Sequence, residues 1–370
     1  MLHPQLLYSQ KKFFQFFPPP QFLLMPSVGI DISDHFVRFM ELIPKHGTFI
    51  VGRFGEQILP SGTIVDGEIK DPNTLKTVLI GLRRDHDLSF VRGSMPEEKA
   101  YLFRTEVPEL SPEETRENIA FQLEEYVPIN PADAVFDYAI TNPLFGKTTS
   151  GLREAVVSVF PRLSVEAYID VYKGAGLTPL SLEMEGSALA RGLIKNGDQG
   201  TYLIVDLGAE RTSLAIFSRG AVRFTTTIDI GGEQLTSAIE RQLNVSHEEA
   251  DKLKKSGAFS RNGQYRELFP ILLDTIVALK EQVSKHYVYW HNHPDKKDTT
   301  PPSPIEKIIL SGGDANLEGL TEHFSLAMQT TVQVGNVWTN AFSTESYIPP
   351  VSFASSLSYG TAIGLALREE

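Results

Sequence analysis

The clearest alternation of apolar and polar residues lies at positions 203–217, which read LIVDLGAERTSLAIF. Two apolar runs, each typical of a buried strand, flank a short polar turn that follows Asp206 and Gly208. The pattern predicts a β-hairpin. A carboxylate at the end of a buried strand costs free energy unless a charged or hydrogen-bonding group receives it. Asp206 therefore indicates either an ordinary turn residue or part of a binding site.

The same order of residues occurs near the N-terminus. An apolar run at 28–31 ends at Asp31, a polar turn follows, and alternating residues at 36–43 and 48–58 predict two further strands. Two hairpins that each carry an Asp at the turn favour two similar halves over a single fold with one decorated loop.

The rest of the chain alternates between helical and strand patterns. Between 105 and 178, helix, two strands and helix form a small α+β unit within the first half; Ser111 and Glu114 predict its start as a capping box. Helices are predicted at 72–84, 112–127, 164–174, 187–194, 233–243, 246–255, 268–290, 317–328 and 358–367, and further strands at 100–104, 136–140, 155–160, 178–182, 221–230, 305–310 and 331–334.

Composition sets limits on what these elements can do. The 370 residues exceed the usual size of one core, so two or more domains are expected. The formal net charge of −12, without a basic run, argues against nucleic-acid binding. The chain has no cysteine, which excludes disulfides and suits a reducing cytoplasm. No apolar run approaches the ~20 residues needed to cross a bilayer.

Residues 1–26 form a separate tail that is rich in Phe and Pro. Three consecutive prolines at 18–20 interrupt its aromatic cluster, so the tail does not fit a signal peptide. We expect the tail to dock its Phe side chains on the first domain; a contact with a membrane surface or a partner is the alternative. Met25 is an alternative start of the protein.

Three loops together indicate a nucleotide site. Gly208 can adopt a positive φ, so that backbone N–H groups and the Thr212 hydroxyl converge on a phosphate while Asp206 holds a hydrated cation. Gly312 and Gly313 follow a predicted buried strand, and their bare backbone could receive a flat base. A glycine pair alone is usually a helix entry, but its combination with two Asp hairpins in this order is more specific.

With these motifs the chain resembles the PilM family of type IV pilus assembly proteins, which are FtsA-like members of the actin, sugar-kinase and heat-shock-chaperone superfamily. The resemblance extends over nearly everything after residue 27. It rests on VGIDIS (28–33), FVRFMEL (36–42), RTEVPELSPEETRENIAFQLEEYVPI (104–129), AGLTPLSLEMEGSALARGL (175–193), TYLIVDLGAERTSLAIF (201–217), TTTIDIGGEQLTSAI (225–239), EEADKLK (248–254), IILSGGDANLEGL (308–320) and YGTAIGLALR (359–368).

The resemblance implies an α/β fold of two lobes, the actin-like ATPase fold with duplicated ribonuclease H-like domains. The first lobe is then expected at 27–104, 179–200 and 353–370, after the N-terminal tail at 1–26. The second lobe is expected at 201–352. An α+β subdomain is expected as an insertion in the first lobe at 105–178.

The resemblance also implies a cleft that binds ATP and Mg²⁺, with Asp31 and Asp206 as the metal-binding residues. Lys254 has a second interpretation, because a cation at a helix end suits the helix dipole whether or not ATP binds. The residues expected at the nucleotide are Asp31 and Ser33 in the first phosphate loop, Asp206, Gly208, Arg211 and Thr212 in the second, Gly231 and Gly232 beside the phosphates, Asp251 and Lys254 at the ribose, and Gly312 and Gly313 at the adenosine.

The first phosphate loop departs from the family's usual Asp-x-Gly-Ser/Thr. Here Asp31 is followed by Ile32, Ser33, Asp34 and His35, so the glycine is replaced and an acid is added. One added negative charge close to phosphate is unfavourable by on the order of 1 kcal/mol or more. We therefore expect the second loop to carry more of the phosphate binding, and the protein to be at most a slow ATPase.

The resemblance further implies a cytoplasmic protein at the inner face of the cytoplasmic membrane, recruited through a partner. The expected partner is the cytoplasmic N-terminus of a PilN-like inner-membrane protein, which would bind as an extended peptide between the first lobe and the inserted subdomain. No nucleic acid and no direct membrane contact are expected.

Three alternatives stay open. The first is a small-molecule kinase that uses Glu183 or Glu185 as the base, and the second is a scaffold that does not bind nucleotide. The third is a homo-oligomeric filament former like FtsA.

Overall fold

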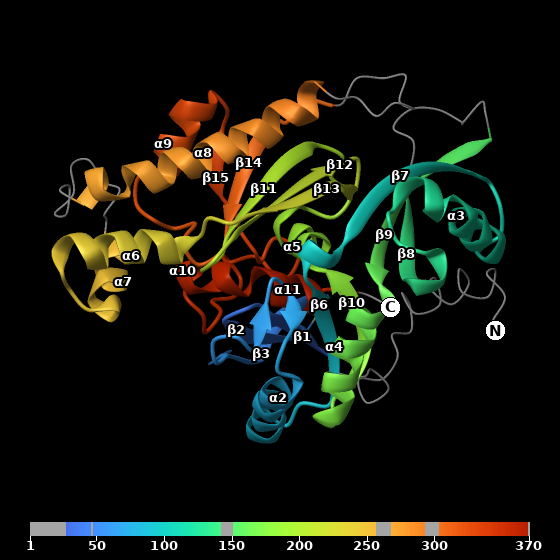
Figure 1. Cartoon of the computed structure of the whole chain (residues 1–370), viewed down its shortest axis with the longest axis horizontal. Helices are drawn as coiled ribbons and strands as arrows, with labels where there is room; N and C mark the ends of the chain where they lie inside the picture. The colour runs from blue at the N-terminus through green and yellow to red at the C-terminus, as the bar shows by residue number, and fades with distance from the viewer. Residues whose placement is uncertain (1–26, 46, 142–150, 257–267, 293–302, 369–370) are drawn as a thin grey trace.

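A computed structural model describes residues 27–45, 47–141, 151–256, 268–292 and 303–368 of the chain. The tail at 1–26 lies outside the described residues. The described elements form two five-stranded sheets, a three-stranded sheet, a two-stranded ribbon and the helices around them (Figure 1).

The first five-stranded sheet contains the hairpin predicted at Asp31 and has the order β10-β6-β1-β2-β3. β1 pairs with β2 and β2 with β3 in antiparallel fashion, whereas β1, β6 and β10 run parallel. Alternate residues such as Ile30 and Phe39 are fully buried and form the core on its faces. The strands are β1 (Ser27–Ile32), β2 (Phe36–Lys45), β3 (Thr48–Ile58), β6 (Phe90–Met95) and β10 (Thr178–Met184).

The second five-stranded sheet repeats this topology with the order β13-β12-β11-β14-β15. Its first three strands form an antiparallel meander, and β11, β14 and β15 run parallel. The two halves predicted from the Asp hairpins are therefore confirmed as two copies of one arrangement. The strands are β11 (Thr201–Leu207), β12 (Thr212–Ser218), β13 (Ala221–Ile228), β14 (Lys307–Ser311) and β15 (Val332–Val334).

Two helices lie between the sheets, α5 (Glu185–Leu193) and α11 (Gly360–Ala366) (Figure 1). Small residues let these helices approach closely. A methyl group added at Gly364 would overlap the backbone carbonyl oxygen of Ala188 on α5. This contact sets the distance between the two helices.

The remaining helices cover the outer faces, and their starts follow from local capping. The Asp71 side chain accepts hydrogen bonds from two N–H groups at the start of α2, and Ser111 and Glu114 form the predicted capping box of α3. The outer helices are α2 (Pro72–His86), α6 (Gly232–Leu243), α7 (His247–Lys255), α8 (Phe269–Asn292) and α9 (Leu320–Met328). The short elements are β4 (Ile64–Val65), β5 (Glu68–Ile69), η2 (Glu97–Lys99), η3 (Pro131–Asp133), α10 (Phe353–Ser356) and η5 (Leu357–Tyr359).

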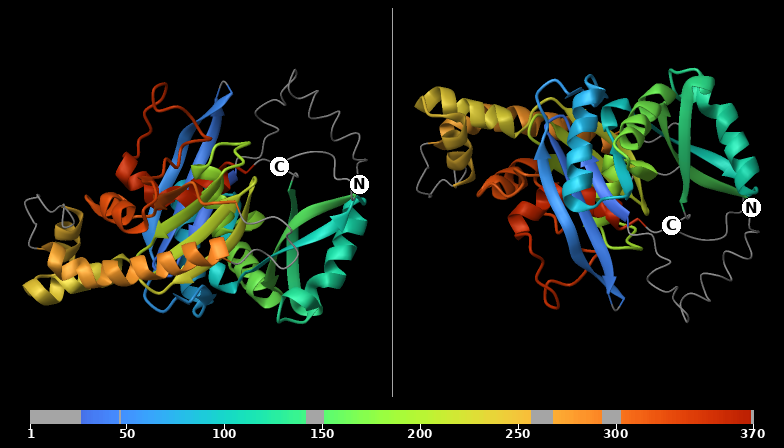
Figure 2. Two further views of the ribbon diagram at one scale, coloured as in Figure 1. Left: turned by 90° about the horizontal axis from the view of Figure 1, so that it is seen from above. Right: turned by 90° about the horizontal axis from the view of Figure 1, so that it is seen from below.

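The inserted subdomain consists of α3 (Pro112–Tyr126) on a sheet of order β7-β9-β8. It has a small core of its own, in which the rings of Phe103 and Tyr126 stack 4.3 Å apart. Figure 2 shows it at the opposite end of the molecule from α6 and α7. Its strands are β7 (Tyr101–Pro108), β8 (Ala134–Thr141) and β9 (Leu152–Pro161).

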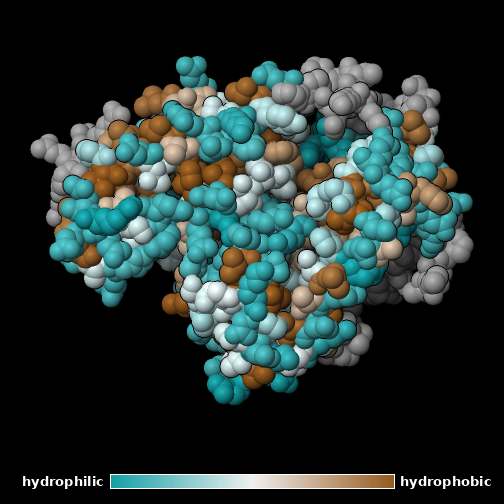
Figure 3. All heavy atoms as spheres, viewed as in Figure 1, coloured by the Kyte–Doolittle hydropathy of each residue, from teal (hydrophilic) through white to brown (hydrophobic). Residues whose placement is uncertain are grey.

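Helix α4 (Arg162–Gly174) belongs with the first lobe in its packing, although the sequence analysis grouped it with the insertion. Its buried residues Tyr168, Val171 and Tyr172 join the main core, and the helix lies beside α2. We therefore propose that the insertion is bounded by β7 and β9. The face of the molecule in Figure 3 is mainly hydrophilic, with hydrophobic residues scattered over it.

We predict that Gly364→Ala lowers the free energy of unfolding by about 1–3 kcal/mol, because the added methyl group overpacks the α5–α11 contact. Gly81→Ala is the matched control: Gly81 lies inside α2 with open space around it, so the same change should raise stability by about 0.5–1 kcal/mol. Urea unfolding monitored by circular dichroism measures both. A neutral Gly364→Ala would contradict the close approach.

Candidate functional site

The turns that follow Asp31 and Asp206 face each other across the cleft between the lobes. They line one cavity of about 120 Å³, together with η2, the start of α5 and the turn before α11. Because the two sheets share one topology, equivalent strand ends meet at this point. The fold therefore brings the two predicted phosphate loops together.

The predicted nucleotide-binding residues divide into two groups. Ser33, Arg211 and the backbone at Gly208 lie at the cavity with both aspartates. Gly312 has a φ of 90° and packs against the backbone of Leu207, while Gly313 presents open space. The residues at the cavity are Asp31, Ser33, Asp206, Gly208, Arg211, Gly312 and Gly313; those outside its lining are Thr212, Gly231, Gly232, Asp251 and Lys254.

The half-buried carboxyl groups of Asp31, Asp206 and Glu185 line this cavity, and Glu97 lies outside its lining. Burial, together with repulsion from Asp31, raises the pKa of Asp206 to about 7. Burial also raises the pKa of Asp31, whereas Arg38 acts in the opposite direction. The pKa of Glu185 lies well above its usual range for the same reasons, and burial raises the pKa of Glu97 to about 8. The cluster therefore favours a proton or a bound cation.

The donor set fits Mg²⁺ in its chemistry, because hard divalent cations prefer carboxylate oxygens. Asp31 Oδ1 is buried and has no hydrogen-bond partner, so one oxygen remains for a cation or its water. Among the described residues, no group of three or more His, Cys, Asp or Glu side chains is arranged to hold a metal ion by itself. Asp31 and Asp206 could thus hold a hydrated cation that phosphate oxygens complete.

The volume of the cavity indicates how much of a nucleotide it can contain. Pockets that bind small ligands typically enclose ~300–1,000 Å³. The cavity here has about 120 Å³. It can contain a phosphate group with its cation, and a complete nucleotide would extend beyond it.

Arg211 crosses the mouth of this cavity. Its guanidinium forms ion pairs with Asp34 at 2.7 Å, Asp66 at 2.7 Å and Glu98 at 2.8 Å, all three on the first lobe. Beside them, His35 Nε2 and Glu210 Oε1 form a hydrogen bond of 2.6 Å. These contacts join the two lobes at the phosphate loops.

Thr212 does not present its hydroxyl to the cavity, contrary to the sequence analysis. The side chain is fully buried and donates a hydrogen bond of 2.7 Å to the carbonyl of Ile230. The hydroxyl therefore fixes the chain that leaves β13 instead of receiving a phosphate.

Lys254 and Asp251, which the resemblance places at the ribose, form ion pairs within the protein. Lys254 is buried, and its Nζ lies 2.9 Å from Asp314, 3.3 Å from Asp251 and 3.3 Å from the carbonyl of Gly232. The backbone of Gly232 lies directly against the Asp314 carboxylate, which a side chain there would overlap. These residues form a buried ion-pair cluster that joins α6, α7 and the loop after β14.

Sequence reasoning missed four acids of this region: Asp66, Glu97, Glu98 and Asp314. The sequence could have indicated Asp314, because this residue directly follows the Gly312-Gly313 pair. Glu97 and Glu98 follow Pro96 at the end of β6, in the position equivalent to the glycine pair after β14. The duplication could have indicated them.

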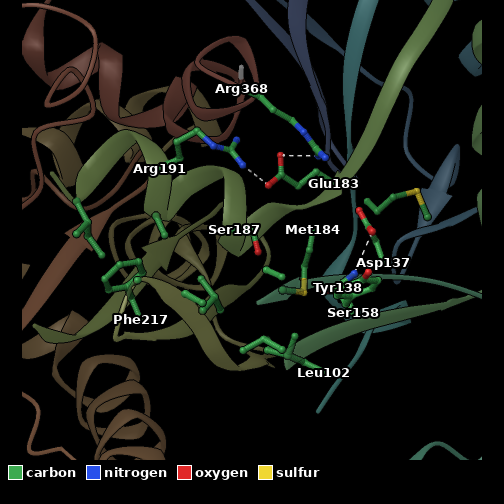
Figure 4. Close-up of a pocket in the computed structure, with 18 of the residues that line it drawn as sticks. Leu102, Asp137, Tyr138, Ser158, Glu183, Met184, Ser187, Arg191, Phe217 and Arg368 are labelled. Atoms are coloured by element: carbon green, nitrogen blue, oxygen red, sulfur yellow. Dashed lines mark hydrogen bonds and ion pairs between the residues drawn. The ribbon is translucent and has the colours of Figure 1, made fainter. Parts of the chain in front are cut away.

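A second, larger hollow of about 600 Å³ lies between the first lobe and the inserted subdomain, and we call it the groove (Figure 4). Its walls are β8 and β9 of the insertion, β10 and α5 of the first lobe, and the turn between β12 and β13. β8 and β10 are edge strands of their sheets. Apolar residues such as Leu102, Met184 and Phe217 alternate with polar ones along it.

Glu183 lies at this groove and not at the nucleotide cleft. It pairs with Arg191 of α5 and, at 3.2 Å, with Arg368 near the C-terminus (Figure 4). Of the two bases considered for a kinase, only Glu185 lines the cleft.

A buried ion pair attaches the insertion to the second lobe. Arg223 of β13 has a side chain that is 1% exposed, and its guanidinium binds both oxygens of Glu154 on β9, at 2.6 and 2.5 Å. Thr141 adds a hydrogen bond of 2.6 Å to the same carboxylate. The bidentate geometry fixes the orientation of β9 relative to β13.

Comparison with known proteins gives one family and one fold. A sequence model of the family described as "Type IV pilus assembly protein PilM" matches residues 29–370. The cell division protein FtsA of Agrobacterium fabrum is 23% identical over 152 residues, which cover 35% of this chain and 33% of that protein. The match thus spans about a third of the relative.

Two solved structures share the fold. One is described as a PilM-PilN type IV pilus biogenesis complex; it has a TM-score of 0.74 and 20% identity, and the match covers 93% of this chain and 98% of that chain. The other is MreB 5 of Spiroplasma citri bound to AMPPNP, with a TM-score of 0.54 and 14% identity over 92% of this chain and 94% of that chain. Both support the expected two-lobed actin-like fold. Within the described residues, no helix is long and apolar enough to cross a membrane.

The raised pKa of Glu97 predicts a pH dependence in metal-free buffer. With its pKa raised to about 8, the Glu97 carboxyl keeps a proton to a higher pH in the folded protein than in the unfolded chain, where its pKa has the ordinary value of 4.5. The folded state therefore binds more protons in this window, and the free energy of unfolding falls as the pH rises. Glu97→Gln cannot titrate, so its free energy of unfolding should rise by a few kcal/mol relative to that of wild type as the pH increases from 5 to 8.

Glu117→Gln, on the exposed face of α3, is the control and should keep a constant difference from wild type. Urea unfolding at several pH values measures both variants. Parallel pH profiles for Glu97→Gln and wild type would refute the raised pKa.

Proposed function

Because the chain belongs to the family of type IV pilus assembly proteins PilM, we propose that it is an ATP-binding adaptor of that machinery. It binds the cytoplasmic N-terminal segment of a PilN-like inner-membrane protein, and this contact places it at the inner face of the cytoplasmic membrane. Nucleotide sets the spacing of its lobes. Hydrolysis, where it occurs, is slow.

The groove is the observation that carries the partner proposal. The groove has edge strands and an apolar lining, and both suit an extended peptide. An edge strand offers unpaired backbone groups to the peptide, and alternate side chains of the peptide enter pockets. β8 and β10 both present such edges. The PilM-PilN complex with the same fold supports a partner of this kind.

The cleft supports the nucleotide proposal through its donor groups. Asp31 and Asp206 hold Mg²⁺, the backbone at Gly208 receives the phosphates, and the open face of Gly313 receives the base. The structure of MreB 5 with AMPPNP supports a nucleotide in this fold. Mg²⁺ supplies charge neutralisation when bound, and the protein's own groups supply position.

A scaffold that does not bind nucleotide is the second candidate. Two observations favour it: the small cavity, and the internal engagement of Thr212 and Lys254. Calorimetry with Mg-ATP separates the two candidates.

We predict that a synthetic peptide with the N-terminal sequence of the PilN-like protein binds this protein with micromolar or tighter affinity. Ser187→Trp places an indole in the groove and should weaken the peptide at least tenfold. Leu326→Trp, at a position that is 79% exposed on α9, should leave the affinity unchanged. Isothermal titration measures all three proteins. Equal affinities for the two tryptophan variants would exclude the groove as the peptide site.

We predict that Mg-ATP binds wild type and that Asp206→Asn weakens it at least tenfold, because the cation loses a carboxylate ligand. Asp133→Asn, on the exposed turn before β8, is the charge-matched control. Titration with and without Mg²⁺ tests the role of the cation. Absence of ATP binding to wild type would select the scaffold.

A further inference from the structure

The Asp34 carboxylate already occupies an anion-binding site at the cleft. Its two oxygens accept hydrogen bonds from the consecutive N–H groups of Asp66 and Gly67, each at 3.2 Å, and an ion pair from Arg211 at 2.7 Å. Two neighbouring N–H groups and a guanidinium are the donors with which proteins hold phosphate.

The two N–H groups belong to the tight turn between β4 and β5. Asp66 and Gly67 have positive φ, of 54° and 68°, as the two-residue turn of an antiparallel hairpin requires. In this turn both N–H groups face the Asp34 carboxylate.

Arg211 and Asp34 connect different lobes. Arg211 lies in the turn between β11 and β12, whereas Asp34 lies between β1 and β2, and Asp66 and Glu98 belong to the first lobe as well. The Arg211 and Asp34 side chains are only 15% and 13% exposed, so solvent screens this pair far less than a surface pair.

From this geometry, and building on the proposed nucleotide function, we propose that Asp34 and Arg211 form a latch with which nucleotide phosphate competes. Asp34 is the intramolecular anion that holds Arg211 and the Asp66–Gly67 N–H groups, and it thereby keeps the lobes closed. A phosphate that binds Arg211 displaces Asp34, and the lobes separate to admit the rest of the nucleotide. The cavity of about 120 Å³ is the closed form of that site.

The latch lowers the apparent affinity for nucleotide, because only the open fraction of molecules binds it. Charge adds to this effect: Asp34, Asp66 and Glu98 place three carboxylates around a single guanidinium. A phosphate beside them is repelled until Asp34 moves away.

Asp34→Asn tests the latch with little change in shape: the amide oxygen can still accept from one of the two N–H groups, whereas the charge that pairs with Arg211 is removed. We expect this variant to bind Mg-ATP, and pyrophosphate with Mg²⁺, about tenfold more tightly than wild type in calorimetry. Asp229→Asn is the matched control: Asp229 lies 3.9 Å from the same Arg211 but is 96% exposed on the second lobe, and its removal should change neither affinity.

A measurement without nucleotide tests the closure separately. The chain contains no cysteine, so Ile80→Cys on α2 and Leu326→Cys on α9 give a single pair of spin labels, one on each lobe. Pulsed electron paramagnetic resonance should show a longer and broader distance in Asp34→Asn than in wild type. Mg-ATP should shift wild type toward that longer distance.

The outcomes separate the latch from the proposed nucleotide function. Tighter binding together with open lobes in Asp34→Asn supports the latch. Equal Mg-ATP binding by wild type and Asp34→Asn overturns the latch and leaves the nucleotide function standing. If neither protein binds Mg-ATP or pyrophosphate, the nucleotide function fails and the competition fails with it. An unchanged lobe distance in Asp34→Asn also overturns the latch.

Discussion

The desolvation of several carboxyl groups in one cleft, to which their mutual repulsion adds, is the constraint on which the centre of this molecule depends. Asp31 reaches the cleft from the first lobe, Asp206 from the second, and Glu185 from the helix between them. The fold brings these groups together, because two sheets of one topology meet at equivalent strand ends around α5 and α11. The cleft therefore has to contain protons, a cationic side chain such as Arg38, or a cation from solution.

Strand β13 connects the cleft to the groove. Its first residues line the groove, Arg223 binds Glu154 of the insertion, and the chain that follows Ile228 is fixed to Thr212 behind the second phosphate loop. A movement of the second lobe would therefore be transmitted to β9 through a bidentate ion pair. The insertion forms one wall of the groove, so the proposed lobe separation and the proposed peptide binding would act on the same geometry.

The sequence predicted the elements that depend on neighbouring residues. It did not predict the contacts that form only when the lobes pack together. The Asp71 and Ser111 caps depend on residues within three positions, and the hairpin at Asp206 on a period of two. The latch joins Asp34 to Arg211 over 177 positions, and Lys254 binds Asp314 over 60. Such pairs follow only from the placement of the lobes. Resemblance located the loops and placed Thr212 and Lys254 at the nucleotide, but it does not report which partners their polar atoms have within the protein.

The contacts of Asp34 in the fold change the interpretation of this residue. In the sequence it is an extra negative charge that weakens phosphate binding by simple repulsion. In the fold, Arg211 and two N–H groups compensate its charge, so its cost arises when the cleft opens and not while it is closed. In the proposed latch, phosphate and Asp34 compete for Arg211 and for the same N–H groups. That competition would link the presence of nucleotide to the position of the lobes without any hydrolysis, which is all that the proposed adaptor requires.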